Sequence, residues 1–350
     1  MRSNSELFGL IKPLDNELFS AWLLRGEASA NPLPFARARE QLLKYNLSEN
    51  NVPIPPRILS QIATTLNVSP TLLNHAFSPT GNWLVIPGIE REFMCEHCLI
   101  EDFKCHRQPT TRRLWGHLWF NVCLEHGGIL KRLNSTEPAI ALFNALDAIW
   151  GPEIVWRRHE SYAVWQMRKV GPPSYKMLIL MASAFQQWYL TAVHKNRFVI
   201  AGQVIDARQD QFELFMDDVL AIIGKKRRHP YDARSYIARL LDIKGWSTLS
   251  SDLSPSAGCE RLLCFSPGEH TPPVRMAMFA LLGLFIKIPG CMRIYLTSTR
   301  SRPYSDGVER LWWGMHSEVG FNQGYLAWLR DRSQAWAPSI KKSFNYLLVG

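Results

Sequence analysis

The sequence lacks a long, uninterrupted hydrophobic run. Its most apolar stretch, residues 276–288, is interrupted by Lys287 and followed directly by Pro289. A helix needs about 20 consecutive apolar residues to cross a bilayer. The first residues also lack the apolar core of a secretory signal peptide. We therefore expect a cytoplasmic protein that does not interact with membranes.

The sequence also lacks the short motifs of several enzyme classes. It contains no glycine-rich phosphate loop, no His-Glu-x-x-His motif and no Gly-x-Ser-x-Gly motif. It has no long alternation of apolar and polar residues, so we expect no large sheet. An RNase-H-like transposase needs such a sheet to hold its two metal ions. We therefore expect a protein without catalytic activity.

Cysteines are few and unevenly distributed. Of the seven cysteines in this chain of 350 residues, four lie close together in one stretch: Cys95, Cys98, Cys105 and Cys123. An odd number of cysteines, clustered and without a signal peptide, favours metal ligands over a disulfide framework. The cluster begins with a C-x2-C pair, and a C-x2-H pair ending in His126 follows after 24 intervening residues.

Together, the two pairs predict one structural zinc ion ligated by Cys95, Cys98, Cys123 and His126. Each pair supplies two ligands from one turn, and four protein ligands leave no open position for water or substrate. Two neighbours of the first pair are alternative ligands that could replace one member of a pair, namely Cys105 and His106.

His117 stands between Trp115 and Trp119 in the sequence. This setting indicates a packed or hydrogen-bonded core residue rather than a metal ligand.

Helical periodicity dominates the rest of the chain and predicts a mainly α fold. We expect an N-terminal helical domain at 1–82 with a helix-turn-helix-like pair, a zinc-binding domain at 83–136, and an all-helical C-terminal domain at 137–350. The C-terminal domain could consist of one body or two subdomains. The expected helices after the zinc segment cover residues 138–150, 174–194, 212–223, 232–245 and 272–288.

The helix-turn-helix-like pair covers residues 56–77. If its second helix entered a DNA groove, its exposed polar residues would be Ser69, Thr71, Asn74 and His75. None of these is an arginine, the residue that most often reads guanine. Pairs of short helices also close the cores of many α domains, so both interpretations remain open.

The chain is basic, with 40 Lys and Arg against 30 Asp and Glu and a formal net charge of +10. A surplus of this kind favours a polyanionic partner such as DNA. The candidate phosphate contacts lie in three clusters: Arg107, Arg112 and Arg113; Lys131 and Arg132; and Lys225, Lys226, Arg227 and Arg228. The last cluster is equally typical of a solvated helix C-terminus.

The zinc segment resembles that of the TniQ/TnsD family of transposition proteins. The family pattern is C-x2-C-L-x-E-D, an arginine and a tryptophan, and then C-x2-H-G with an apolar residue beyond. The matching residues are Cys95, Cys98, Leu99, Glu101, Asp102, Arg113, Trp115, Cys123, His126, Gly127 and Leu130. Many members carry a further CxxC pair, whereas this chain has no cysteine between His126 and Cys259. One zinc ion is therefore expected.

The N-terminus and the C-terminal half show further similarity to the family. The N-terminal match comprises Pro13, Glu17, Ser20, Trp22, Leu23 and Arg25. In the C-terminal half, a tyrosine-led helix ending at Gly245 and an apolar helix after a histidine and prolines resemble the TnsD type. The three similarities together touch about two thirds of the chain.

The resemblance implies a bacterial target-site selector for a Tns-type transposon. Such a protein binds double-stranded target DNA directly, or docks on a CRISPR Cascade–crRNA complex, and recruits a TnsC-like AAA+ ATPase regulator. For that ATPase we expect a docking surface on the N-terminal helices, with Trp22 inside and Arg25, Arg37 and Arg39 outside. A homodimer is compatible with this role. The main alternative is a zinc-containing helix-turn-helix transcriptional regulator, and a pure protein adaptor is a third.

Overall fold

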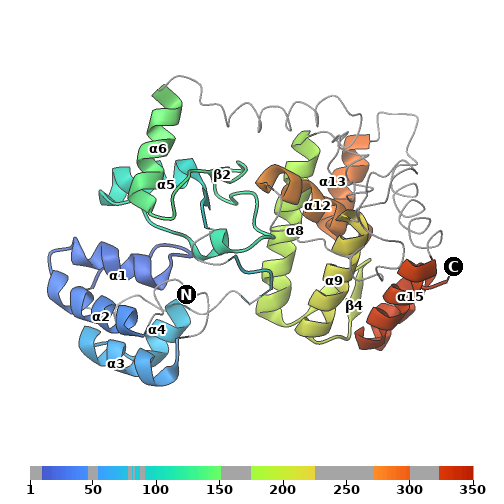
Figure 1. The fold of residues 1–350 in the computed structure, drawn as a ribbon, viewed down its shortest axis with the longest axis horizontal. Helices are drawn as coiled ribbons and strands as arrows, with labels where there is room; N and C mark the ends of the chain where they lie inside the picture. Colours follow the sequence, from blue (N-terminus) through green and yellow to red (C-terminus); the bar gives the residue numbers. More distant parts are fainter. Residues whose placement is uncertain are drawn as a thin grey trace, which may run out of the picture. The chain divides into compact units, whose positions relative to one another are not determined.

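The computed structural model describes residues 10–45, 54–77, 81, 83–86, 91–150, 175–224, 271–299 and 323–349. Helices dominate these residues, which confirms the predicted mainly α fold (Figure 1). The chain divides into two compact units. The first comprises residues 1–120 and 130–153, and the second comprises residues 121–129 and 154–350. The predicted domain boundaries at 82 and 136 stay predictions.

The first unit begins with four helices that share one apolar core. They are α1 (Phe19–Glu27), α2 (Pro32–Lys44), α3 (Pro56–Leu66) and α4 (Pro70–Ala76). Trp22 is fully buried, and its ring centroid lies 5.2 Å from that of Phe35. A Cβ atom on Gly26 would lie 2.0 Å from the Phe35 ring, so α1 and α2 approach closely because residue 26 has no side chain. Trp22 therefore lies inside, as predicted.

Helices α3 and α4 confirm that residues 56–77 form a helix pair. Asn67 ends α3 in the left-handed conformation, with φ of 55°. Ser69 then caps α4, because its hydroxyl accepts a hydrogen bond from the Thr71 amide at 3.3 Å. The candidate residues Ser69, Thr71, Asn74 and His75 are all exposed.

The remainder of the first unit has little regular structure besides two helices. These are α5 (Glu96–His106) and α6 (Pro138–Trp150), accompanied by the short 3-10 helix η3 (Arg113–Gly116). The two-residue strands β1 (Phe93–Met94) and β2 (Lys131–Arg132) pair antiparallel. An isolated bridge joins Glu17 to Arg112, so the N-terminal segment is paired with the segment that precedes η3.

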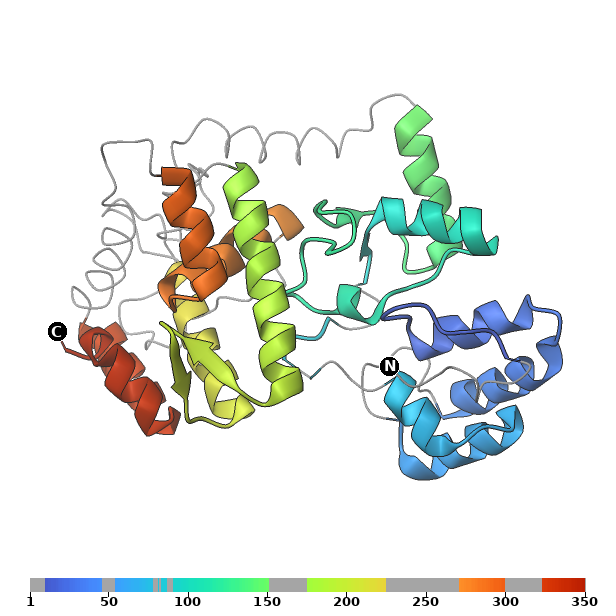
Figure 2. The same cartoon turned by 180° about the vertical axis from the view of Figure 1, so that it is seen from behind.

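The second unit is built around a helix that is buried along its whole length. This is α12 (Pro272–Phe285), and all of its residues are buried. It packs against α8 (Tyr175–Lys195), α9 (Gln209–Gly224) and α13 (Pro289–Thr299), as Figure 2 shows from behind. The C-terminal part adds α15 (Gln323–Arg332), η5 (Ser333–Ala335), α16 (Pro338–Phe344) and η6 (Asn345–Leu347).

The prediction of an all-helical C-terminal domain missed a short hairpin. Strands β3 (Phe198–Ile200) and β4 (Gln203–Ile205) pair antiparallel. Ala201 and Gly202 form the turn with φ of 49° and 77°, the positive values that a tight hairpin turn requires. Phe198, Ile200 and Ile205 are buried. The turn aligns two strands of three residues each. Strands this short show no clear alternation of apolar and polar residues in the sequence, so the prediction missed them.

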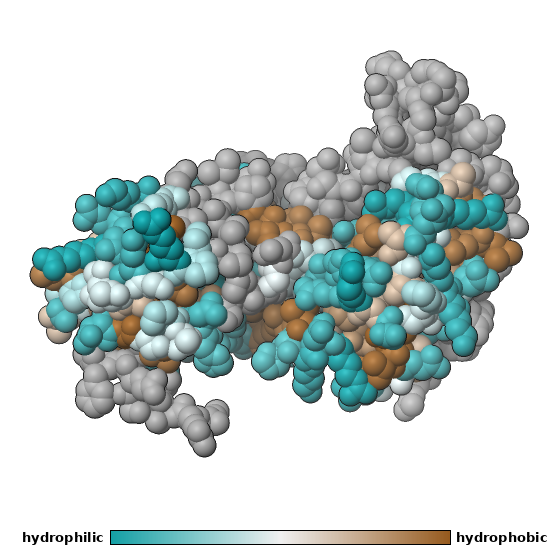
Figure 3. All heavy atoms as spheres, turned by 90° about the horizontal axis from the view of Figure 1, so that it is seen from below, coloured by the Kyte–Doolittle hydropathy of each residue, from teal (hydrophilic) through white to brown (hydrophobic). Residues whose placement is uncertain are grey.

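In the part of the chain that the structure describes, no single helix is long and apolar enough to cross a membrane, although α12 and residues 289–297 pass this test as a pair bent by 100°. Exposed apolar side chains lie among hydrophilic ones on the face shown in Figure 3. The predicted helix at 232–245 and the cluster at 225–228 lie outside the described residues.

Candidate metal centre

The first pair of cysteines lies where a short strand meets a helix. Cys95 follows β1 and is the N-cap residue of α5, and Cys98 lies in the first turn of that helix. Both side chains are buried. Glu96, between them, accepts a hydrogen bond from Lys131 of β2 at 2.5 Å. This contact and the pairing of β1 with β2 fix the start of α5.

The second pair lies in a tight turn. The Gly127 amide donates a hydrogen bond to the Cys123 carbonyl at 2.8 Å, and the Cys123 amide donates to the Gly128 carbonyl at 2.8 Å. Gly127 has φ of 64°, a conformation that glycine adopts without strain. These contacts bring His126 back toward Cys123, and their Nδ1 and Sγ atoms lie 3.6 Å apart.

A buried glutamine of the second unit holds the segment that leads into this turn. The Gln186 side-chain oxygen accepts hydrogen bonds from the amides of Asn121 and Val122, each at 3.0 Å. Its side-chain nitrogen donates to the Val122 carbonyl at 2.7 Å. Arg275 of α12 donates to the Asn121 side chain at 3.0 Å. The backbone before Cys123 is thus fixed by side chains distant in the sequence.

The side chains of Cys95, Cys98, Cys123 and His126 come together. Their ligand atoms all lie within 4.8 Å of one another. A tetrahedral zinc site with Zn–S of about 2.3 Å and Zn–N of about 2.0 Å has ligand–ligand distances of about 3.5 to 3.8 Å. The 3.6 Å separation of Cys123 and His126 falls in this range. The predicted residues can therefore hold one metal ion.

This ligand set has consequences for the chemistry of the site. Three sulfur ligands and one imidazole favour zinc over the oxygen-preferring Mg²⁺ and Ca²⁺. Four protein ligands fill a tetrahedral shell, so a bound ion would stabilise the fold rather than activate water. The alternative ligand Cys105 is exposed near the C-terminal end of α5, and neither it nor His106 belongs to the cluster.

His117 is a buried core residue, as predicted. Its Nδ1 atom lies 3.3 Å from the Trp83 carbonyl oxygen, and its ring centroid lies 4.9 Å from that of Trp119. Burial lowers the pKa of His117 to about 4, the Trp83 hydrogen bond opposes this shift, and the nearby Arg91 and Arg113 lower the pKa further. The imidazole is therefore neutral at pH 7.

The predicted phosphate contacts of the zinc segment have structural partners. Arg112 donates to the buried Asp102 carboxylate at 2.7 Å, and the Thr110 amide donates to the same carboxylate at 3.2 Å. Arg113 donates to the Ala76 carbonyl at 3.4 Å, and burial lowers its pKa. These arginines join parts of the first unit, so a phosphate would have to compete with internal contacts.

The remaining candidates differ in their surroundings. Lys131 pairs with Glu96, and Arg132 pairs with Glu92 at 2.6 Å. Arg107 is exposed and ends α5 in the left-handed conformation. The phosphate contacts proposed for all of these residues, and for Lys225 to Arg228, stay predictions.

The expected surface position of Arg25 is wrong. Arg25 is buried, and its guanidinium donates to both carboxylate oxygens of Glu17 at 2.8 and 2.7 Å. It also donates to the Lys12 carbonyl at 2.7 Å. Glu17 and Arg25 both belong to the N-terminal motif noted in the sequence. Their spacing of eight residues does not reveal that they form a buried bidentate ion pair. Arg39 pairs with Glu27 at 2.6 Å, and Arg37 is exposed.

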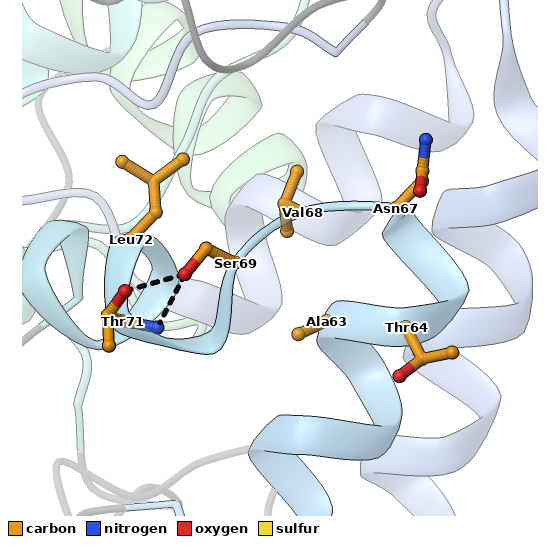
Figure 4. A pocket seen from close by; sticks show the side chains of 7 residues that line it. All are labelled: Ala63, Thr64, Asn67, Val68, Ser69, Thr71 and Leu72. Atoms are coloured by element: carbon orange, nitrogen blue, oxygen red, sulfur yellow. Dashed lines mark hydrogen bonds between the residues drawn. The ribbon is translucent and has the colours of Figure 1, made fainter.

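A hollow of about 730 Å³ lies beside the turn between α3 and α4. Figure 4 shows Ala63 and Thr64 on α3 and, at the start of α4, Ser69 with its hydroxyl turned toward Thr71. The two hydroxyl oxygens lie 2.5 Å apart. None of the residues lining the hollow is charged. It therefore offers hydroxyl and amide groups, but no charge that would attract phosphate.

Comparison with known proteins gives no match: no family model, no curated protein and no solved structure matches the chain.

Proposed function

We propose that this chain is a non-catalytic target-site selector for a Tns-type transposon. It holds one structural zinc ion, binds double-stranded target DNA, and recruits an AAA+ ATPase regulator. Docking on a Cascade–crRNA complex is the alternative route to the target. The observation that carries this proposal is the complete Cys₃His ligand set at Cys95, Cys98, Cys123 and His126. These four residues are also the centre of the segment that resembles the TniQ/TnsD family.

Other residues of the family-like pattern have roles around this ligand set. Leu99, Trp115 and Leu130 are buried, and Asp102 accepts hydrogen bonds from the segment that precedes η3. Gly127 has the positive φ that its turn requires. The pattern therefore describes a local structure rather than unrelated surface positions, which supports the resemblance.

The N-terminal pattern also corresponds to one local structure. Glu17 and Arg25 form the buried ion pair. Trp22 and Leu23, which lie between them in the sequence, are fully buried. The Trp22 indole donates to the Ile11 carbonyl at 2.9 Å. Leu10 and Ile11 of the segment before α1 thus pack against the core as partly buried residues. Of the three arginines expected on the ATPase-docking surface, Arg25 is buried, Arg39 pairs with Glu27, and Arg37 is exposed.

A zinc-containing transcriptional regulator is the second candidate, and the helix pair α3–α4 is the observation that favours it. Helix α4 has only seven residues, and the adjacent hollow has no charged lining. Both features are less favourable for groove insertion than a longer helix bearing arginines. The two candidates differ in their partner, because only a selector recruits an AAA+ regulator.

A reconstitution experiment tests the proposed function. The purified protein is bound to immobilised duplex DNA carrying a candidate attachment sequence, with and without a Cascade complex, and retention of a purified TnsC-like AAA+ regulator is measured. We expect retention that depends on this protein. DNA binding without retention would favour the transcriptional regulator, and retention without DNA or Cascade would favour a protein adaptor.

A point substitution tests the docking surface more cleanly than a truncation. Deleting residues 1–14 would remove the carbonyl groups that accept hydrogen bonds from Trp22 and Arg25. We instead expect Arg37→Glu to reduce ATPase retention while leaving DNA binding unchanged. Arg57→Glu is the matched control, because Arg57 is also exposed but belongs to α3 rather than α2. Equal effects of the two variants would contradict this docking surface.

A further inference from the structure

A groove of about 390 Å³ lies between the C-terminal half of α8, strand β3 and the start of α13. All of these elements belong to the second unit. Its lining includes apolar residues such as Ala184, Trp188 and Ile288. Three cationic residues also line it: Lys195 at the end of α8, Arg197 directly before β3, and Arg293 on α13.

The two segments of the chain that line this groove contain no acidic residue. Neither residues 175–205 nor residues 271–299 include an aspartate or glutamate. Lys195, Arg197 and Arg293 are exposed, and none of the three forms an ion pair with another described residue. By contrast, Arg112, Lys131 and Arg132 in the first unit each pair with a carboxylate. Within the described part of the chain, the three cations of the groove are thus not neutralised by ion pairs.

The backbone that carries these cations is well fixed. Asn196 ends α8 with φ of 45°, and the Arg197 amide donates to the Ala192 carbonyl at 2.9 Å. The Trp188 indole crosses to β3 and donates to the Val199 carbonyl at 2.9 Å. A Cβ atom on Gly290 would lie 3.2 Å from the Ala184 side chain, so α13 starts in close contact with α8. A ligand would meet a preorganised wall.

We propose that this groove binds the sugar–phosphate backbone of duplex DNA. The inference rests on the proposed function, and it assigns DNA contact to residues that the sequence patterns did not single out. Exposed lysine and arginine side chains bind phosphate by charge, and the exposed Gln187 amide adds an uncharged donor. Backbone contacts position a protein on DNA without reading its sequence. The groove therefore supplies affinity and orientation.

The test neutralises the three cations together as Lys195→Gln, Arg197→Gln and Arg293→Gln in the full chain. Fluorescence anisotropy measures the affinity for a fluorescein-labelled random-sequence duplex of about 30 base pairs, a length that spans about three helical turns, at several KCl concentrations. We expect the slope of log affinity against log salt to become shallower by about 2 to 3, since each phosphate contact contributes about 0.9. At 0.1 M salt the affinity should fall on the order of 100-fold.

A second triple variant controls for net charge. Lys44→Gln, Lys176→Gln and Lys342→Gln also remove three exposed cations, but none of these residues lines the groove. We expect this control to change the slope by less than half as much. Circular dichroism and thermal melting check that both variants fold.

The outcomes separate this inference from the proposed function. If the wild-type protein shows no salt-dependent binding to duplex DNA, the direct DNA binding in the proposed function fails, and the groove assignment fails with it. If the wild type binds DNA and the two triple variants have equal slopes, only the groove assignment is overturned. A groove variant that loses binding to a poly-glutamate peptide but keeps full DNA affinity would also overturn it, and would indicate an acidic protein partner.

Discussion

The segment around the Cys/His cluster and the helices around α12 are held together by different interactions. Between residues 83 and 133, several backbone segments pair only through isolated bridges or two-residue strands. Many buried side chains of this segment are polar or charged: Arg91, Glu96, Asp102, Thr110, His117 and Asn121. Around α12, buried rings contact one another, as when Phe185 lies 5.4 Å from Phe279 and Phe198 lies 4.4 Å from Phe212.

This difference follows from secondary structure. A buried helix satisfies its own backbone groups, so its side chains can be almost entirely apolar, as in α12. A loop-rich segment must satisfy buried backbone and side-chain groups through specific partners, and it has fewer apolar contacts to stabilise it. Buried polar contacts, together with an ion bound at the Cys/His cluster, would then supply the missing stability. The two regions should therefore respond differently to chelators, pH and changes in packing.

The largest expected effect is that of metal removal. Cys98→Ser should reduce bound zinc from one ion per chain to none, as measured by elemental analysis. It should also unfold the segment around the cluster, because structural zinc contributes roughly 10 kcal/mol or more in zinc-finger peptides. Cys105→Ser is the matched control, since Cys105 is exposed and outside the cluster. Two zinc ions per chain, or a Cys98→Ser protein with unchanged stability and zinc content, would refute the site.

The buried ion pair of the N-terminal helices should give the next largest effect. Arg25→Ala leaves the Glu17 carboxylate buried without its bidentate partner, which should lower the free energy of unfolding by about 3 to 5 kcal/mol. Arg39→Ala breaks a pair in which the arginine side chain is 38% exposed, and it should cost about 0 to 1 kcal/mol. Urea denaturation measures both. Similar losses for the two variants would show that burial does not determine the strength of this contact.

The sequence predicted helices and metal ligands, but it did not reveal contacts between distant residues or buried pairs such as Glu17–Arg25. Periodicity predicted α3, α4, α6 and α8 to within one or two residues, because each repeats apolar positions along one face. The four metal ligands were predicted because short spacings within each pair constrain them locally. The hydrogen bonds between the Gln186 side chain and the amides of Asn121 and Val122 were not predicted. They join residues more than 60 positions apart, and no periodic pattern in the sequence marks them.

A third prediction concerns acid sensitivity of the segment around the cluster. The pKa of His117 is lowered from 6.5 to about 4 in the folded protein, so the unfolded chain takes up a proton first as the pH falls. The stability linked to neutral His117 is fully present above pH 6.5 and is lost as the pH falls toward 4. The loss should reach about 3 kcal/mol.

Substitution isolates this contribution from acid effects on the metal ligands. His117→Gln removes the titrating group, and urea denaturation at saturating zinc between pH 7 and pH 4.5 compares it with the wild type. We expect the wild type to lose more stability than the variant over this interval. Parallel pH profiles would mean that His117 is not the acid-sensitive group.

The last and smallest effect tests whether the α12 region depends on close apolar packing alone. A Cβ atom on Gly283 would lie 2.6 Å from the Cys291 sulfur, which is buried and donates to the Met181 carbonyl at 3.3 Å. Gly283→Ala should therefore lower the free energy of unfolding by about 1 to 3 kcal/mol through overpacking, despite the higher helix propensity of alanine. Cys291→Ala removes the obstructing sulfur, so the double variant should recover part of that loss. Thermal denaturation of both single variants and the double variant gives the coupling energy. Strictly additive effects would contradict overpacking against the Cys291 sulfur as the cause of the loss. Unchanged zinc content in all three variants would show that the loss does not act through the metal site.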